Sequence, residues 1–477
     1  MAKTSHIAVI SIPAFSHQAS IVEFCKRLLR LHHHYHVTCF FPIIDAPVPA
    51  TVTFLESLPP NIDYTFLPPV NKEDLPQDVP PAVQIQLAVS QSMPSFRHAL
   101  GSLNSTTPLT ALIADPFANE ALEIAKEFNL LSHIYFPPSA MTLSLFLYLP
   151  ILHEQVSSEY RDHKEAIQIP GCIPIQGHDL PEHFQHRSSL AYKLILERCR
   201  RFSLADSFLV NSFSEIEEGT VRALQEHNKG INKNNAPIYL VGPIIQTAIN
   251  SESNESECVR WLEKQRPNSV LYVSFGSGGT VSQQQLEELA LGLELSGEKF
   301  LWVLKPPSDS ANADYLGATN DDPLQFLPEG FLERTEGQGL VVPNWAPQTQ
   351  ILSHSSTGGF LTHCGWNSTL ESIVLGVPMV TWPLFAEQRM NAVLLTESIK
   401  VALRPKFNEN GIADREEISK VIKCLMCGEE GNGIKKRIEK LKDAGAAALK
   451  GDGSSTRALS QFGTRMQNFL GQPFGFL

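Results

Sequence analysis

The sequence has no excess of basic residues and no long apolar run, and each absence excludes a class of protein. Its 477 residues include 50 acidic and 38 basic side chains, and the resulting net charge of −12 disfavours binding to nucleic acid. The apolar run 141–152 is too short to span a bilayer and contains Pro150. The N-terminus enters a strand-like run directly, without the pattern of a secretory signal. We therefore expect a cytoplasmic protein without integral membrane contact.

Signatures of metal ions and dinucleotide cofactors are also missing. No D-x-D pair of carboxylates, of the kind that holds a divalent cation, occurs in the chain. The eight cysteines are scattered, and the C-x-x-C of Cys424 and Cys427 has no second pair, so we interpret the cysteines as free thiols. The glycine turn at 276–279 does not match G-x-G-x-x-G. We predict no metal site and no cofactor.

The composition and the order of apolar segments indicate an α/β protein with more than one domain. A hydrophobic fraction of 43% and a charged fraction of 18% are typical of globular proteins, and 477 residues are too many for one core. Strand-like runs alternate with helical patterns, which favours doubly wound parallel sheets. The runs lie at 6–12, 37–41, 111–114 and 133–136, and others begin at 270, 299, 339, 360 and 377. We interpret residues 140–200 as irregular and the polar residues 246–257 as a linker.

The stretch Trp345–Gln388 carries the most specific chemistry of the chain. An aromatic residue and a turn open it, and a short apolar strand, a Cys-Gly turn and the start of a helix follow. A helix N-terminus after such a turn binds phosphate through backbone N–H groups and the helix dipole. His363 adds a donor, and Glu371 is placed to accept from the vicinal hydroxyls of a ribose. Glu387 and Gln388 can bind sugar hydroxyls, so the stretch predicts a site for a nucleotide-sugar.

The same stretch resembles the signature box of the plant secondary-product UDP-glycosyltransferases from end to end, including WAPQ, HCGWNS, GVP and the closing EQ. In that family the first Trp stacks on uracil, the His and the Asn-Ser pair hold the diphosphate, the Glu holds the ribose, and the last two residues bind the sugar. The closing Gln is associated with glucose, and Glu387 stands where many members have Asp. The donor-binding residues implied by the resemblance are Ser277, Trp345, Ala346, Gln348, His363, Trp366, Asn367, Ser368, Glu371, Glu387 and Gln388.

The resemblance extends over essentially the whole chain and is tightest in the C-terminal half. Within the family the chain is most similar to the hydroquinone (arbutin-type) and monolignol glucosyltransferases. The resemblance implies the GT-B fold class, in which two Rossmann-like, doubly wound parallel-sheet domains face each other across a cleft. The implied organisation is an N-terminal acceptor-binding domain at 1–245, a linker at 246–257, a C-terminal UDP-sugar-binding domain at 258–454, and a C-terminal helix at 455–477 that packs back on the first domain.

Two residues of the N-terminal half are candidates for a catalytic pair. A base is expected at the carboxyl end of a strand in the acceptor-binding domain, and His17 follows the first strand-like run. Asp115 ends another predicted strand and can orient the imidazole and stabilise its protonated form. Both match the family's catalytic His and Asp by position. The loop before His17 departs from the glycine-rich family pattern and contains Phe15.

The acceptor pocket is expected to be mostly apolar and to lie in the N-terminal domain. For each candidate taken alone, ordinary core packing explains the residue as well as acceptor contact does. The candidates are Phe15, Phe117, Met141, Phe146, Leu180 and Phe184.

These patterns and the resemblance together predict an inverting, metal-independent UDP-glycosyltransferase. It would transfer glucose from UDP-glucose to the hydroxyl of a small phenolic plant metabolite, with the helix after Gly365 relieving the charge on departing UDP. The alternatives are a flavonoid or isoflavonoid acceptor with O-, N- or C-transfer, a different UDP-sugar, or a catalytically silent protein that binds nucleotide-sugar or phenolics. The expected partners are the two small-molecule substrates and no nucleic acid, and we expect a monomer.

Overall fold

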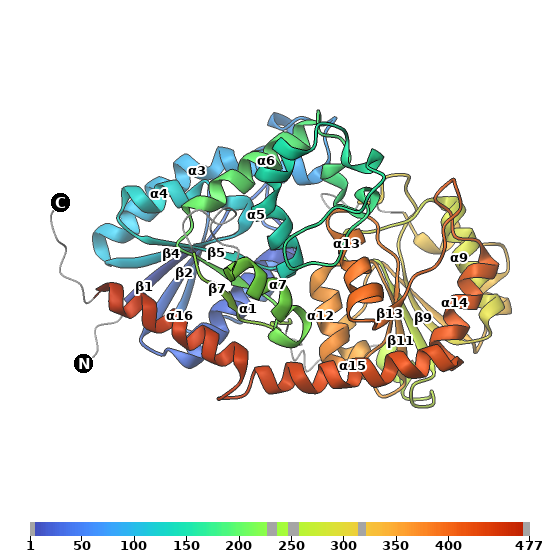
Figure 1. The fold of residues 1–477 in the computed structure, drawn as a ribbon. Helices are drawn as coiled ribbons and strands as arrows, with labels where there is room; N and C mark the ends of the chain where they lie inside the picture. Colours follow the sequence, from blue (N-terminus) through green and yellow to red (C-terminus); the bar gives the residue numbers. More distant parts are fainter. Residues whose placement is uncertain (1–4, 227–235, 247–256, 313–320, 471–477) are drawn as a thin grey trace. The chain divides into compact units, whose positions relative to one another are not determined.

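The computed structural model describes residues 5–226, 236–246, 257–312 and 321–470 (Figure 1). The chain divides into two compact units, of which unit 1 comprises residues 1–174, 183–246 and 447–477, and unit 2 comprises residues 175–182 and 247–446. Residues 247–256 of the expected linker lie outside the described part of the chain. The domain limits expected from the sequence stay a prediction.

The sheet of unit 1 is parallel, with its strands in the order β3-β2-β1-β4-β5-β6-β7. Its central strands are continuous apolar runs because helices cover both faces of a parallel sheet. The strands are β1 (Ser5–Ile10), β2 (Tyr35–Phe41), β3 (Ile62–Phe66), β4 (Leu109–Ala114), β5 (Leu131–Phe136), β6 (Ser207–Val210) and β7 (Ile238–Leu240).

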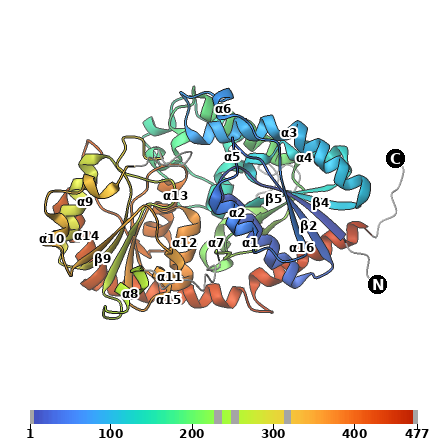
Figure 2. The ribbon, with the colours of Figure 1, turned by 180° about the vertical axis from the view of Figure 1, so that it is seen from behind.

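Helices pack on both faces of this sheet (Figures 1 and 2). Helices α1, α2 and α16 share one apolar core with one face of the strands, and α3 and α4 lie on the other face. The helices are α1 (Phe15–Leu31), α2 (Pro49–Leu55), α3 (Pro81–Thr106), α4 (Ala121–Glu127), α5 (Ala140–Gln155), α6 (Leu190–Arg201), α7 (Ser214–Glu226) and α16 (Ser454–Leu470).

Helix α16 joins unit 1 although nearly all of unit 2 separates it from the rest of that unit in the sequence. Leu459, Phe462 and Met466 are fully buried in the core beneath the sheet. The hydroxyl of Tyr35, at the start of β2, donates a hydrogen bond of 2.9 Å to the carbonyl of Gly463. The core of unit 1 is therefore completed by residues from the far end of the described chain.

The sheet of unit 2 is also parallel, in the order β10-β9-β8-β11-β12-β13. Helices α9 and α14 pack together on one face, and α11 and α12 pack on the other (Figures 1 and 2). The strands are β8 (Val270–Ser274), β9 (Lys299–Leu304), β10 (Gly339–Pro343), β11 (Thr357–Thr362), β12 (Met379–Thr381) and β13 (Ala402–Leu403). The helices are α8 (Glu257–Leu262), α9 (Gln283–Ser296), α10 (Phe331–Arg334), α11 (Gln348–Ser353), α12 (Trp366–Leu375), α13 (Gln388–Val393), α14 (Arg415–Cys427) and α15 (Glu429–Ala448).

Each sheet reverses its strand order beside its first strand. In unit 1, β1 lies between β2 and β4, and in unit 2, β8 lies between β9 and β11. Ligands of doubly wound sheets bind at such a switch point, beyond the carboxyl ends of the strands. The loops that follow β1 and β4, and those that follow β8 and β11, are therefore the places where site residues are expected.

The prediction that residues 140–200 are irregular is wrong, because this region contains α5 and α6. Helix α5 is buried along most of its length, so its sequence lacks the one-sided apolar pattern that identifies a surface helix. Ser139 caps its start by accepting the N–H of Thr142 at 3.2 Å, and Pro150 lies inside it. A helix that is apolar on all sides gives no periodic signal, which explains the error.

Candidate active site

The loops after β1 and β4 bring His17 and Asp115 together. The sheet register pairs Ile10 with Ala114, so the two strands end side by side. His17 lies in the first turn of α1, and Asp115 caps the 3₁₀ helix η2 (Pro116–Ala118). Nδ1 of His17 lies 2.7 Å from Oδ2 of Asp115. The carboxylate is fully buried and 18% of the His17 side chain is exposed, so the imidazole is the member of the pair that reaches the surface.

Phe117 links this pair to buried groups behind it. Its N–H donates to Oδ1 of Asp115 at 2.9 Å, and its ring stands edge-on to the imidazole of His17, with 5.8 Å between the centroids. The guanidinium of Arg198 lies 3.7 Å from the centroid of the Phe117 ring. Gln86 accepts from Nε of Arg198 at 3.2 Å and donates to the Phe117 carbonyl at 3.1 Å. Burial lowers the pKa of Arg198 to about 10, opposed in part by the charge of Asp115.

In unit 2 the loops after β8 and β11 meet around His363. A Cβ atom on Gly276, whose φ is 76°, would lie 2.6 Å from the imidazole, and one on Gly365 would lie 2.5 Å from it. Only glycine therefore lets both backbones approach the ring. Burial, and then the charge of Lys305, lower the pKa of His363 to about 4, so its imidazole is neutral near pH 7. Its Nδ1 is buried and finds no hydrogen-bond partner among the described residues.

Helix α12 begins directly after this turn. Cys364 adopts a left-handed φ of 64°, and Nδ2 of Asn391 donates to its carbonyl at 2.9 Å, which holds the turn in place. Gly365 is the N-cap and has no side chain with which to cap the helix. The N-terminal end of the helix dipole thus lies at the switch point of the sheet, which suits a diphosphate.

Three of the predicted donor-binding side chains contact one another. The amide nitrogen of Gln348, at the start of α11, donates to Oγ of Ser368 at 2.9 Å and to Oε2 of Glu371 at 2.6 Å. Burial raises the pKa of the Glu371 carboxyl to about 7, and the bond from Gln348 works against this rise. Ser368 and Glu371 lie on α12, so this polar cluster joins the helix that begins at the switch point to the start of α11.

Trp345 exposes 73% of its surface, which is unusual for tryptophan, whereas the neighbouring Ala346 is buried. The residue before it, Asn344, has a left-handed φ of 62° that turns the chain after β10. The indole ring is thus available for stacking with an aromatic ligand.

The side chain of Gln388 stabilises the loop that ends in Glu387 and Gln388. Oε1 of Gln388 accepts the N–H groups of Leu384 at 2.8 Å and of Phe385 at 2.9 Å, and the side chain is buried. Ala386 adopts a left-handed φ of 51°. Because the amide oxygen serves the loop, the part of the Gln388 side chain suited to a ligand is its NH₂ group, which donates.

The predicted acceptor residues lie in several places. Phe117 lies beside His17, and Phe15 packs edge-on against Phe54 with 6.0 Å between the centroids. The rings of Phe146 and Phe184 stack with 6.1 Å between their centroids. The buried candidates are Met141, Phe146, Leu180 and Phe184, of which Leu180 belongs to unit 2. Their role as acceptor contacts stays a prediction.

Three residues beside these two groups, namely Gln86 and Arg198 in unit 1 and Lys305 in unit 2, were not predicted from the sequence. No motif marks Arg198, because its partner Gln86 is 112 residues away. Lys305 directly follows β9, and its Nζ donates to the carbonyl of Ser277 in the turn after β8. The position of Lys305, directly after a strand that flanks the switch point, is a signal that could have identified this residue from the sequence.

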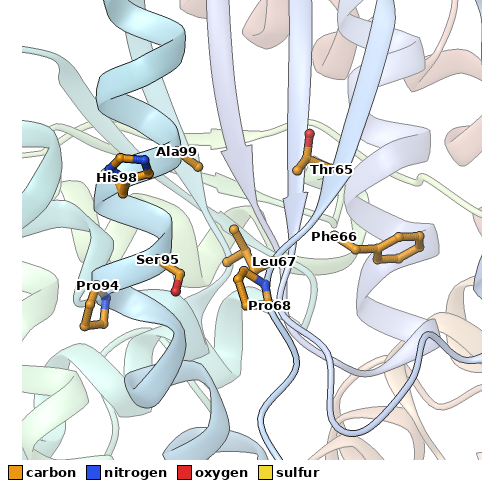
Figure 3. A pocket seen from close by; sticks show the side chains of 8 residues that line it. All are labelled: Thr65, Phe66, Leu67, Pro68, Pro94, Ser95, His98 and Ala99. Carbon is orange, nitrogen blue, oxygen red and sulfur yellow. The ribbon is translucent and has the colours of Figure 1, made fainter.

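Outside these loops, a hollow of about 410 Å³ opens on unit 1 between α3 and the end of β3 (Figure 3). It is lined by Thr65, Phe66, Leu67, Pro68, Pro94, Ser95, His98 and Ala99, none of which is a predicted site residue. In the part of the chain that the structure describes, no group of three His, Cys, Asp or Glu side chains is arranged to hold a metal ion. None of the described helices combines the length and apolar character needed to cross a bilayer.

Comparison with known proteins gives matches over nearly the whole chain. Residues 246–409 match the family described as "UDP-glucoronosyl and UDP-glucosyl transferase". A hydroquinone glucosyltransferase of Rauvolfia serpentina is 50% identical over 471 residues, which cover 98% of this chain and 99% of the relative.

Two solved structures share the fold. One is a UDP-glucosyltransferase from Polygonum tinctorium, capable of glucosylating indoxyl and in complex with 3,4-dichloroaniline. It is 44% identical with a TM-score of 0.89, covering 97% of this chain and 98% of that one. The other is Phytolacca americana UGT2 complexed with UDP-2-fluoro-glucose and pterostilbene. It is 41% identical with a TM-score of 0.87, covering 98% of this chain and 100% of that one.

Proposed function

The chain belongs to the UDP-glucosyl transferase family, and we propose that it transfers glucose from UDP-glucose to the hydroxyl of a small phenolic compound. The family and the fold of two parallel α/β units, predicted from the sequence, are confirmed. The choice of a phenolic acceptor is supported by the full-length similarity to a hydroquinone glucosyltransferase and by the relative solved with pterostilbene. The observation that carries the proposal of catalysis is the His17–Asp115 pair at the switch point of unit 1.

In the proposed reaction His17 acts as the base. Nε2 takes the proton of the acceptor hydroxyl while the oxygen forms a bond to C1 of glucose. The bond from C1 to the phosphate oxygen breaks on the opposite side, and the electron pair of that bond leaves with UDP. The configuration at C1 is therefore inverted. Asp115 accepts the hydrogen bond from Nδ1 and stabilises the imidazolium that forms.

Unit 2 would hold the donor through the residues grouped at its own switch point. The exposed indole of Trp345 is suited to stack on uracil, and the Gln348–Glu371 pair is suited to ribose. The N-terminus of α12, with neighbouring His363, would stabilise the charge of departing UDP. Glu387 would accept from sugar hydroxyls and the NH₂ group of Gln388 would donate to them.

A direct test is to incubate the protein with UDP-glucose and a panel of simple phenols, and to follow UDP release together with the mass of the product. We expect at least one phenol to gain a hexose. The panel includes aromatic amines, because a solved relative is in complex with 3,4-dichloroaniline, and flavonoids, because they are the alternative acceptors left open by the sequence. Binding of UDP-glucose without transfer to any member would instead identify a silent nucleotide-sugar binder.

A further inference from the structure

Residues 175–182, here called the strap, belong to unit 2 although the chain before and after them belongs to unit 1. The strap contains the 3₁₀ turn η4 (Gly177–Asp179), which contacts helix α13. Helix α13 begins at Gln388, directly after Glu387. The strap therefore lies against the element that carries the predicted sugar-binding pair.

Two arginines of unit 2 hold the strap in place. Nη2 of Arg404 donates to Oδ1 of Asp179 at 2.8 Å, and only 9% of the Asp179 side chain is exposed. Nη1 of Arg389 donates to the carbonyl of His178 at 3.2 Å. The side chain of Leu180 is fully buried. A half-buried ion pair and a hydrogen bond to a backbone carbonyl thus fix the strap to unit 2 by different interactions.

The strap ends on the loop that closes around Gln388. The N–H of Glu182 donates to the carbonyl of Ala386 at 3.2 Å. Ala386 is the residue with a left-handed φ of 51°, a conformation that is strained for a residue other than glycine. Such a conformation persists only where surrounding contacts enforce it, and the bond from Glu182 is one of these contacts.

We propose that the strap determines sugar specificity by holding the loop 384–388 in the geometry that presents Glu387 and Gln388 to the sugar. Asp179 and Arg404 are positioning residues in this arrangement: they fix the strap, and the strap fixes Ala386. The proposal rests on the proposed function in one respect, because it assumes that Glu387 and Gln388 face the sugar of a UDP-sugar.

The test compares the native protein with Asp179→Asn, Arg404→Gln and the double variant. We expect the ratio of kcat/KM for UDP-glucose to that for UDP-galactose to fall about tenfold in each single variant, which is part of the roughly 10²-fold that a misplacement of about 1 Å can cost. The double variant should lose no more than either single one, since both act through one contact. The affinity for UDP, which lacks the sugar, should stay at the native value.

Two further variants separate this effect from general damage. Glu294→Gln breaks the comparable Arg334–Glu294 pair of unit 2, 2.8 Å long, and should leave the donor ratio unchanged. Arg404→Lys keeps the charge but loses the fork geometry and should give an intermediate ratio. It also serves as the test if Asp179→Asn does not fold. An unchanged ratio in folded variants of both Asp179 and Arg404 would overturn the proposal.

Binding measurements distinguish failure of this inference from failure of the proposed function. The ratio of the affinity for UDP-glucose to the affinity for UDP measures the contribution of the sugar contacts. It can be determined in the absence of any acceptor. If the native protein transfers no sugar but this affinity ratio falls in Asp179→Asn, the strap keeps its role and the proposed transferase function is wrong. If the affinity ratio is the same in native protein and variants, the strap does not position the sugar-binding pair.

Discussion

Nδ1 of His17 and Oδ2 of Asp115 lie 2.7 Å apart, and this contact fixes the imidazole from its buried side. A carboxylate only accepts, so it favours the tautomer with hydrogen on Nδ1 and the lone pair on Nε2. We expect His17→Ala to lower kcat by about 10²–10⁴-fold and to leave UDP affinity unchanged, as steady-state kinetics and calorimetry will show.

Unit 1 contains a matched control for this substitution. Nε2 of His36 also lies 2.7 Å from a carboxylate, Oδ2 of Asp63, but His36 is near the start of β2 and not at its carboxyl end. His36→Ala should have native kcat. Native turnover in His17→Ala would remove His17 from the mechanism.

Gln388 should decide the choice of sugar through its NH₂ group. Its oxygen accepts two N–H groups of its own loop, so only the nitrogen is suited to bind a sugar hydroxyl. We expect UDP-glucose to be preferred over UDP-galactose and UDP-xylose. Gln388→Glu, which keeps an acceptor for the loop but removes the donor, should lower kcat/KM for UDP-glucose by roughly 10–100-fold with UDP affinity retained. Equal kcat/KM for the three donors in the native enzyme would contradict this role.

Transfer should persist when divalent cations are removed. The N-terminus of α12 and the buried His363 are suited to stabilise the diphosphate without a metal. We expect activity in excess EDTA to stay within about twofold of that of the untreated enzyme. Removal of a catalytic metal would cost several kcal/mol of transition-state stabilisation and would lower the activity far more than twofold. Complete loss on chelation, restored by Mn²⁺, would refute the account of the donor site.

Binding of UDP-glucose should weaken as the pH falls below about 7. Burial raises the pKa of Glu371 to about 7, so the carboxylate that accepts from the ribose is charged above this pH and protonated below it. The dissociation constant for UDP-glucose, measured by calorimetry, should increase as the pH is lowered from about 7 to about 6. The increase should become steeper and approach about tenfold for each pH unit. His363, with a pKa of about 4, and Tyr272, whose pKa burial raises, do not titrate in this window.

Glu371→Gln provides the control for the pH series. The amide has a similar shape and does not ionise, so UDP-glucose should bind more weakly and with the same affinity across the series. A pH dependence that persists in this variant would assign the titration to another group.

Arg198 should affect both stability and acceptor turnover. Arg198→Met leaves Oε1 of buried Gln86 without its guanidinium donor, so the free energy of unfolding should fall by about 1–3 kcal/mol in urea denaturation. Adding Gln86→Leu removes the second polar group and should recover part of this loss. Acceptor kcat/KM should stay low in both variants, because Phe117 loses the guanidinium over its ring in each of them and, in the double variant, also the bond from Gln86 to its carbonyl. Full activity in the double variant would show that Arg198 acts on stability alone.

The sequence predicted best those features whose residues lie close together in the chain or end a strand. The turn at His363 and the start of α12 are contiguous, so one stretch of sequence contains the whole motif. His17 and Asp115 are 98 residues apart, but each follows a strand, and parallel strands end at one edge of a sheet. The sequence placed each residue after a predicted strand, and the resemblance to the family paired them.

Features that depend on contacts between distant, unpatterned residues could not be predicted. Gln86 and Arg198 come from different helices and carry no periodic signal. The contacts of the strap could not be predicted either, because its anchors are an ion pair between residues 225 apart and a backbone bond to Ala386. Helix α5 was not predicted because a helix buried on all sides lacks the polar face by which a surface helix is recognised in the sequence.

The place of α16 has a consequence for how the chain is made. Residues Leu459, Phe462 and Met466 leave the ribosome only after all of unit 2 has been synthesised, yet they belong to the core of unit 1. Until α16 is synthesised, the apolar surface that it covers on the sheet of unit 1 stays exposed. Chaperones and other chains can bind to this surface. Quality control of this protein then depends on how soon its last described helix arrives.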